Sequence, residues 1–411
     1  MQQLFCLNFC RKDLFIFIIG LFSMIKIRLL GTFGVSELFV FVSYLFINPF
    51  IVQKNVQIRR LITFTFIWLI GVIFSDLVNH STLENSLKGA FNVIFIIALI
   101  PFVYWALNDK LERMLYFWAG VAVGSILGFK FQRVEMMNEL AADTWQVYAV
   151  KWLFLFLGGW LYYKGRIKFS YILILSFATW TLFHQSRNIF LMFVLTISIL
   201  LYIGEITEFN IRDKYMRYRQ SILRLFFVLC IAFIGISYTY ETLAANGMLG
   251  EYAKGKYEKQ KNTELGLASG RADFLASLYA ISKKPIFGYG SYAKDKDRVF
   301  AKFNKMMGLP YMDLRNGKNH VPGHSYMLGA WVNAGILGFI FWLFVLKKIF
   351  VFLRYYLFNE PQLLCINLLL TFTLLWNIFF SPFSDRLNFV FYIISILLIS
   401  NEDRQLDVNT Q

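Results

Sequence analysis

The sequence predicts an all-α polytopic membrane protein with about twelve transmembrane helices and one large loop, and three observations support this. Of its 411 residues, 58% are hydrophobic, more than soluble globular domains contain. Several apolar runs approach the ~20 residues that a helix needs to cross the hydrocarbon core of a bilayer. Lys and Arg gather in short clusters beside these runs, so the positive-inside rule explains the formal net charge of +16 better than nucleic-acid binding does.

Apolar runs separated by charged breaks give the expected spans. The first run has the length of a signal-peptide core, but no small-residue cleavage site follows it, so we expect a first span there. Several runs are shorter than ideal, which a thin or locally deformed bilayer accommodates. The twelve expected spans are 14–30, 35–52, 61–78, 89–107, 114–129, 146–163, 170–184, 189–203, 222–240, 325–346, 362–380 and 387–400.

These spans divide the chain into four parts. An N-terminal transmembrane bundle of about nine spans takes up residues 1–240, and about three C-terminal spans follow in residues 325–400. Between them lies a large polar loop, residues 241–324, which we expect to be partly helical. Residues 401–411 form a tail.

Basic clusters at alternate span ends predict the orientation. They would all lie on one side of the membrane, which the positive-inside rule makes the cytoplasmic side, together with both termini. The loop 241–324 then lies on the opposite, outer side. Lys26 and Arg28 contradict this pattern, since they would fall at the outer end of the first span. The cytoplasmic clusters are Lys54 with Arg59 and Arg60, Lys110 with Arg113, Lys164 with Arg166 and Lys168, the basic residues of 212–224, and Lys347 with Lys348 and Arg354.

Three glycines, Gly120, Gly124 and Gly128, recur at four-residue spacing in the fifth expected span. Small residues at this spacing let a neighbouring helix approach closely. We expect intramolecular packing within the bundle here, and a dimer face is the less favoured alternative.

The loop 241–324 carries fourteen Lys or Arg and eight Asp or Glu, a net charge of +6. Such a loop either attracts an anionic substrate or headgroup or is a solvated basic segment. None of the four cysteines falls in it, so it holds no internal disulfide. No cysteine pair has metal-ligand spacing with histidines nearby, so the sequence offers no metal site of that kind.

Arg271 opens a predicted short amphipathic helix in this loop. Ser269 is a suitable N-cap and Gly270 eases the entry of the chain, whereas an Arg in the first turn opposes the helix dipole. That mismatch indicates a ligand-binding role for Arg271; an ordinary surface arginine is the alternative. The segment 285–290 should end the helix at its proline and form a tight turn or a close backbone approach at its two glycines. The apolar face of the helix would comprise Phe274, Leu275, Leu278 and Ile281.

Two more polar residues stand at outer span ends. Arg187 follows Ser186 in a turn between two short apolar helices, where it either snorkels at the membrane boundary or holds a phosphate through paired N–H donors. His324 begins the tenth span, and a neutral imidazole there can take a proton from a hydroxyl. A lone boundary histidine is otherwise structural, and His320 is a weaker candidate for the same role.

Five short motifs occur in order along the chain: Ser186-Arg187-Asn188, Ser269-Gly270-Arg271, Pro285-Ile-Phe-Gly288-Tyr-Gly290, Gly323-His324-Ser325 and Ala334-Gly335-Ile-Leu-Gly338. Together they resemble the O-antigen ligase and polymerase superfamily of bacterial glycosyltransferases. Each motif alone is weak evidence; their order, spacing and placement on one face carry the resemblance, which covers roughly residues 170–345.

The resemblance implies a GT-C-like helical bundle in the bacterial inner membrane, with a large periplasmic loop and an active site that faces the periplasm. It also implies a metal-independent inverting transfer of a glycan from undecaprenyl pyrophosphate to an acceptor hydroxyl, without a cofactor and without nucleic acid. The acceptor would be another lipid-linked repeat or lipid A-core, and other polysaccharide-assembly proteins could be partners.

The same resemblance implies roles for single residues. Arg187 and Arg271 would hold the pyrophosphate and stabilise the charge that builds as it departs, and His324 would be the general base. Family members often carry Asn after the motif histidine, whereas this chain has Ser325. The candidate substrate-binding residues are Ser186, Ser269, Gly270, Tyr289, His320 and Ser325.

The sequence leaves open which member of the superfamily this is. The motifs are shared between ligases and polymerases, and the Phe-, Ile-, Lys- and Asn-rich composition slightly favours a polymerase. The alternative from another class is a transporter or flippase of lipid-linked oligosaccharide. Few charged residues within the spans and the absence of repeated halves speak against it. A glycan-binding or scaffold protein of the envelope is a third class.

Overall fold

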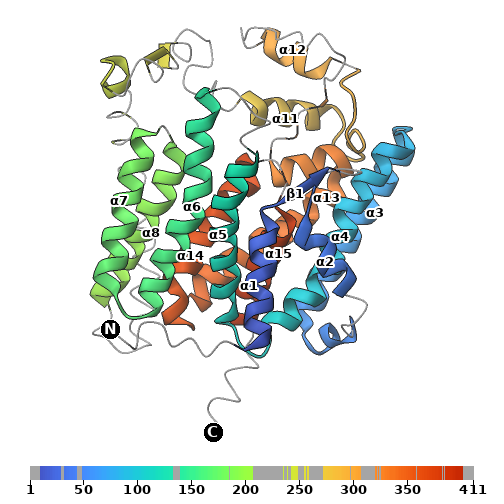
Figure 1. Cartoon of the computed structure of the whole chain (residues 1–411). Coiled ribbons are helices and arrows are strands. Elements are labelled where there is room, and N and C mark those ends of the chain that lie inside the picture. The colour runs from blue at the N-terminus through green and yellow to red at the C-terminus, as the bar shows by residue number, and fades with distance from the viewer. Residues whose placement is uncertain are drawn as a thin grey trace.

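The computed structural model is a bundle of α-helices with one short antiparallel hairpin (Figure 1). Helices α11 and α12 lie across one end of the bundle, which we call the loop side (Figure 1). The structure describes residues 10–28, 32–43, 49–132, 139–184, 186–206, 242–248, 272–296, 298–306, 325–357, 359–381 and 385–400, and the isolated positions 235, 238, 254–255, 257–258, 320–321, 323 and 383. The helices are α1 Arg11–Ser23, α2 Val35–Ser43, α3 Val56–Val78, α4 Leu83–Leu107, α5 Arg113–Gln132, α6 Glu139–Tyr163, α7 Ile167–Phe183, α8 Arg187–Ile206, α11 Ala272–Lys283, α12 Val299–Met306, α13 Tyr326–Val351, α14 Leu364–Phe380 and α15 Arg386–Ile399.

The length and apolar composition of the helices confirm a multi-pass helical membrane protein. Within the described part of the chain, four helices are long and apolar enough to cross a membrane: α3, α4, α13 with the turn that continues it to Tyr356, and α14 with the turn that precedes it from Pro361. Shorter apolar helices occur in α5, α7, α8 and α15. The expected span 222–240 falls outside the described residues except at two positions.

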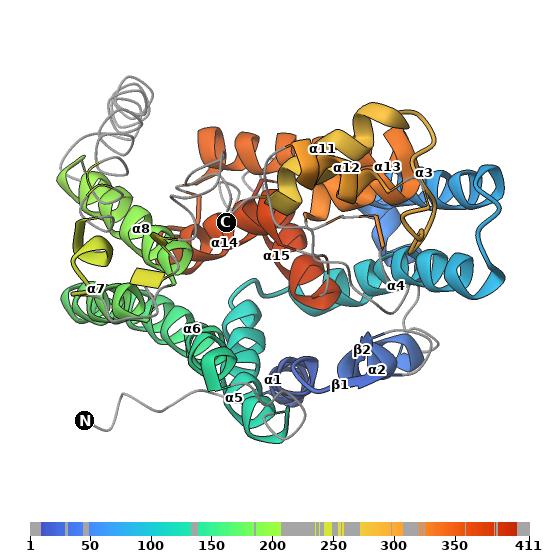
Figure 2. The ribbon, with the colours of Figure 1, turned by 90° about the horizontal axis from the view of Figure 1, so that it is seen from above.

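Helix α15 forms the centre of the bundle. Every residue from Arg386 to Ile399 is buried, and α15 packs mainly against α4. On one flank α3 runs along α13, where the rings of Phe64 and Phe344 stack 4.3 Å apart. On the other flank α14 contacts α6, α8 and α13. Figure 2 shows both flanks from above, with α6, α7 and α8 on one side and α3 and α4 on the other.

The N-terminal region differs from the two spans expected at 14–30 and 35–52. Helix α1 ends at Ser23, and a hairpin of β1 Lys26–Arg28 and β2 Thr32–Gly34 leads into α2. The thirteen residues of α1 and nine of α2 measure about 20 and 14 Å, short of a hydrocarbon core of about 30 Å. The two cations that broke the charge pattern therefore belong to a hairpin and not to the end of a span.

The glycine spacing in α5 has the intramolecular role expected of it. A Cβ atom at Gly120 would lie 2.1 Å from the carbonyl oxygen of Phe17, and one at Gly124 would lie 2.2 Å from that of Leu21. On the other helix, a Cβ at Gly20 would lie 2.2 Å from the carbonyl oxygen of Phe117. The backbones of α1 and α5 thus touch, which confirms packing within the bundle.

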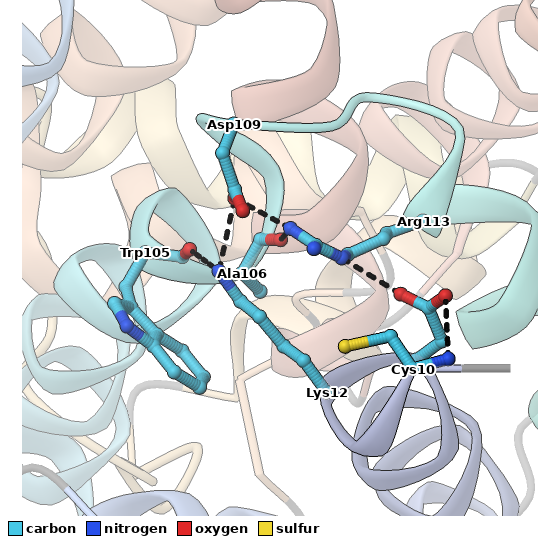
Figure 3. Close-up of polar contacts among 7 residues, drawn as sticks. Cys10, Lys12, Trp105, Ala106, Asp109 and Arg113 are labelled. Carbon is cyan, nitrogen blue, oxygen red and sulfur yellow. Dashed lines mark hydrogen bonds and ion pairs between the residues drawn. The ribbon is translucent and has the colours of Figure 1, made fainter.

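A polar cluster fixes the start of α1 to the turn between α4 and α5 (Figure 3). Arg113 donates to Asp13 at 2.8 Å and pairs with Asp109 at 2.5 Å. Lys12 donates to Asp109 at 2.9 Å and to the carbonyl oxygen of Trp105 at 2.8 Å. Partial burial would raise the pKa of Asp109, but the hydrogen bonds from Arg113 and Lys12 outweigh it and lower that pKa to about 2.

Candidate functional site

Helix α13 contains a reversal of the chain at Gly335. This residue has φ 64° and ψ −156°, a combination essentially confined to glycine. The ring of Tyr326 lies 5.3 Å from that of Trp342, although sixteen positions of a continuous helix would separate them by about 24 Å. The residues before Gly335 therefore fold back along those after it, so the span expected at 325–346 is not one continuous helix.

The reversal brings the first residue of α13 into the interior of the bundle. Tyr326 packs edge-on against Phe383, with ring centroids 4.8 Å apart. Trp68 of α3 contacts Phe383 at 5.8 Å, and ten positions, or about 15 Å, separate Trp68 from the loop-side end of α3. Non-helical backbone at such a depth is tolerated in a membrane protein where it is enclosed by protein or lines a cavity. The start of α13, at Ser325 and Tyr326, is therefore buried inside the bundle.

The segment 285–290 closes the turn at Gly335. The amide of Tyr289 donates to the carbonyl of Val332 at 2.7 Å, and the amide of Ile336 donates to the carbonyl of Ile286 at 3.0 Å. These bonds satisfy the backbone groups that the reversal frees. The two glycine-rich motifs, far apart in sequence, are therefore one structural unit.

The glycines of segment 285–290 have the role expected of them. Gly288 has φ 69°, and a Cβ there would lie 2.4 Å from the carbonyl oxygen of Val332. Gly290 has φ 87°, and a Cβ there would lie 2.4 Å from the hydroxyl of Ser81. Both positions combine a left-handed backbone with a close approach, which only glycine allows.

An aspartate in α3 anchors the same segment from the other side. The carboxylate of Asp76 is 5% exposed and accepts hydrogen bonds from the amide of Ser291 at 2.6 Å and its hydroxyl at 2.8 Å. Asn79 donates to the carbonyl of Gly288 at 3.2 Å. Sequence reasoning missed Asp76, although a lone acid near the end of an apolar run is a signal for a buried polar partner.

The chain that carries His324 is fixed on both sides of that residue. Before it, the amide of Val321 donates to Ala293 at 3.0 Å, and Nδ1 of His320 is 3.0 Å from the carbonyl of Tyr292. After it, Ser325 is the N-cap of α13. Its hydroxyl accepts from the amide of Leu328 at 2.9 Å and donates to the carbonyl of Ile378 at 2.7 Å. His324 itself lies outside the described residues.

Helix α11 confirms the helix expected after Arg271, and its start lies over the loop-side end of α14. The ring of Phe274 lies 5.4 Å from that of Phe380, the last residue of α14. The expected apolar face is partly wrong, because Leu278 is 41% exposed. Arg271, Ser269 and Gly270 lie outside the described residues. The buried face of α11 contains Ala276, Ser277, Ala280 and Ile281.

Helix α8 begins with Arg187, whose side chain is outside the described part of the structure. The hydroxyl of Ser186 is buried and has no hydrogen-bond partner among the described residues. Five positions into α8, Met192 accepts a hydrogen bond from Thr373 of α14 at 3.8 Å. Met192 and Thr373 therefore lie at the same depth. Helix α8 leads away from the loop side and α14 leads toward it, so five positions back along α8 and five positions forward along α14 reach the same level. The start of α8 is thus level with Ile378.

The remaining candidate, Tyr289, faces α11. Its hydroxyl donates to the carbonyl of Ala280 at 3.2 Å, and the ammonium of Lys284 lies 4.8 Å from its ring centroid. The side chain is buried. Tyr289 therefore fixes α11 to segment 285–290, and α11 follows directly after Arg271.

A buried ion pair, not foreseen from the sequence, borders the site. Arg386 donates to both carboxylate oxygens of Glu37, at 3.1 and 2.6 Å, and to the side-chain oxygen of Asn92. Asn92 in turn donates to the hydroxyl of Tyr292 at 2.9 Å. The network connects α2, α4 and α15 to the chain segment that supports His320.

Comparison with known proteins bears on the same region. A family model described as O-antigen ligase matches residues 153–343. This range contains every motif from which the resemblance was drawn and confirms it. A comparison with curated proteins gave no significant match.

Proposed function

Because residues 153–343 belong to the O-antigen ligase family, we propose that this protein is an inverting membrane glycosyltransferase. It transfers a glycan from undecaprenyl pyrophosphate to an acceptor hydroxyl at the periplasmic face of the bacterial inner membrane. Family membership supports a lipid-linked glycan as the substrate. In this proposal the leaving group is stabilised by arginine side chains, and no metal ion or other cofactor takes part.

The convergence of three helix starts on one helix end carries the proposal. Helix α8 begins with Arg187, α11 begins directly after Arg271, and α13 begins two residues after His324. All three starts lie near the loop-side end of α14, through the contacts of Thr373, Phe380 and Ile378. In this proposal a pyrophosphate bound in this layer is held by Arg187 and Arg271, with His324 beside the acceptor hydroxyl.

The chemistry follows from these three side chains. The acceptor oxygen attacks the anomeric carbon as the bond from that carbon to the pyrophosphate oxygen breaks, and the configuration inverts. His324 takes the proton of the acceptor hydroxyl. Arg187 and Arg271 bind phosphate oxygens through paired N–H donors and stabilise the negative charge that develops on the leaving group.

The other candidate substrate-binding residues differ in the hydrogen bonds that their polar atoms make in the structure. The buried hydroxyl of Ser186 would donate to the phosphate, together with the chain at Ser269 and Gly270. The hydroxyls of Tyr289 and Ser325 already bond to backbone groups, so both residues would act by positioning α11 and His324. His320 is exposed and would contact the acceptor glycan.

Alanine variants test the proposal in cells that depend on this gene for surface polysaccharide. Arg187→Ala and Arg271→Ala should each lower transfer at least ~100-fold, because each removes a charge that stabilises the departing pyrophosphate. His324→Ala should stop transfer while donor binding persists. Arg166→Ala is the matched control, since Arg166 is exposed in the turn between α6 and α7. Near-normal polysaccharide in both arginine variants, at wild-type protein levels, would contradict the pyrophosphate role.

A further inference from the structure

Lys151 is a buried cation in the middle of an apolar helix. It lies in α6, is 6% exposed, and its ammonium is 4.4 Å from the ring centroid of Trp152. The ring of Trp152 stacks on that of Trp118 at 5.2 Å. A charged side chain at such a place is expensive, and in membrane proteins it marks a substrate pathway or a paired site by default.

The packing of α6 on α14 gives the level of Lys151. A Cβ at Gly159 would lie 2.7 Å from Cβ of Ile366, so these two positions are level. The two helices point in opposite directions, and eight positions toward the loop side lead from Gly159 to Lys151 and from Ile366 to Leu374. Asn377 lies three positions, or about 4.5 Å, further along α14. The four-carbon stem of a lysine can bring its ammonium to that level.

This level lies near the loop-side end of α14, where α8, α11 and α13 begin. Lys151 interacts electrostatically with Asp385, which directly precedes α15. The negative charge of Asp385 also interacts with the buried Tyr326, whose hydroxyl is hydrogen-bonded to Asn377. Tyr326 follows Ser325, so Lys151 belongs to the buried polar surroundings of the start of α13.

We propose that Lys151 binds a phosphate oxygen of the lipid-linked substrate from the membrane side. The inference rests on the proposed function. The lipid chain of the substrate lies in the bilayer, so its pyrophosphate reaches the site from the bundle side. Arg187 begins α8 and Arg271 directly precedes α11 in the sequence, and a third cation on the bundle side would complete the neutralisation of the pyrophosphate. Lysine, a compact point charge, suits a single phosphate oxygen.

The competing explanation is that Lys151 only forms a structural ion pair with Asp385. The two explanations predict different effects on stability and on substrate binding. Replacing both members of a buried pair by neutral residues is often neutral or stabilising, whereas removing one member is strongly destabilising. Lys151→Met should therefore lower the melting temperature, and Lys151→Met with Asp385→Asn should restore it. A substrate-binding lysine predicts that binding is not restored in the double variant.

The test measures binding of undecaprenyl pyrophosphate to the purified full-length protein in nanodiscs, alongside the melting temperature. We expect the double variant to keep the wild-type melting temperature and to bind at least tenfold more weakly, and Lys151→Arg to retain part of the affinity. Lys348→Met is the matched control, because Lys348 is half-buried in α13 with its ammonium on Gln57. Its binding should equal that of the wild type.

The outcomes distinguish this inference from the proposed function. Wild-type affinity in the double variant would overturn the role of Lys151 alone, because the donor would still bind through the arginines. If the wild-type protein and Arg187→Ala bind undecaprenyl pyrophosphate equally poorly, the proposed function itself fails, and the inference with it.

Discussion

At the scale of single residues, the site depends on backbone conformations that only glycine permits. Gly335 reverses α13, and Gly288 and Gly290 let segment 285–290 lie against the turn. A Cβ at Gly335 would lie 1.9 Å from the carbonyl oxygen of Ile286. These glycines bring the start of α13, Ser325 and Tyr326, into the interior by setting the direction in which the helix starts.

We therefore expect Gly335→Ala to destabilise the protein by more than ~3 kcal/mol, since it combines a forbidden backbone conformation with a backbone clash. Gly165→Ala is the control. Gly165 also has positive φ, 72°, but has no atom within 4 Å of a Cβ, so it should cost only about 1 kcal/mol. Melting temperatures in detergent measure both. Equal losses would mean that the contact with Ile286 contributes nothing.

The sequence predicted where these glycines matter but not the geometry they create. Gly288 and Gly290 follow a proline in a polar loop, a local signal for a close approach. The reversal at Gly335 sits inside a long apolar run whose composition is that of an ordinary span. Its cause is a pair of hydrogen bonds to a segment about fifty residues earlier, and no periodicity within the run encodes that partner.

At the scale of elements, α1 and α5 pack backbone against backbone in the N-terminal half. At Gly20, Gly120 and Gly124 the backbone of one helix lies directly against the backbone of the other, with no side chain between them. This packing was predicted from spacing alone, because small residues four apart form one face whichever helix lies against it. The partner helix could not be predicted, and neither could the early end of α1, which the hairpin 26–34 imposes.

A glycine-to-alanine substitution should destabilise the protein less at the C-terminal end of α5 than in its middle. Gly120→Ala places a Cβ 2.1 Å from the carbonyl oxygen of Phe17 and should cost about 1–3 kcal/mol through overpacking. Gly128→Ala meets its nearest atom at 3.3 Å, and the helix gains the propensity of alanine, so its effect should be near zero. Thermal unfolding compares the two, and a similar loss in both would disprove backbone contact between α1 and α5.

The polar cluster at the start of α1 predicts a pH dependence of stability. Because the pKa of Asp109 is lowered to about 2, its stabilising contribution is present above its unfolded pKa near 4 and is lost as the pH falls from 4 toward 2. At pH 7, Asp109→Asn should cost less than about 1 kcal/mol, since the carboxylate is half-exposed. The difference in melting temperature between wild type and variant should shrink as the pH falls through 4 and vanish below pH 2. A difference that persists there would exclude the ionised carboxylate as its cause.

At the scale of the whole molecule, the proposed site draws on helix starts spread over the chain, and this limited what the sequence could predict. Arg187, Arg271 and His324 stand out as polar residues at span ends. Asp76, Lys151 and Glu37 carry only the signal of a lone charge in an apolar run, and the tertiary structure alone sets their partners. The family match covers 153–343, so Asp76, Glu37 and Arg386 lie in parts of the chain that it does not reach.

The last prediction concerns which glycan acceptor the whole protein serves. The family is shared by ligases and polymerases, and the composition favours the polymerase, whose acceptor is another lipid-linked repeat. Deletion of the gene should then leave lipid A-core carrying one short repeat, because the separate ligase still attaches single units. Electrophoresis of extracted lipopolysaccharide measures this, and complementation with His324→Ala should reproduce the deletion while the wild-type gene restores long chains. Loss of every attached repeat would instead assign the protein as the ligase.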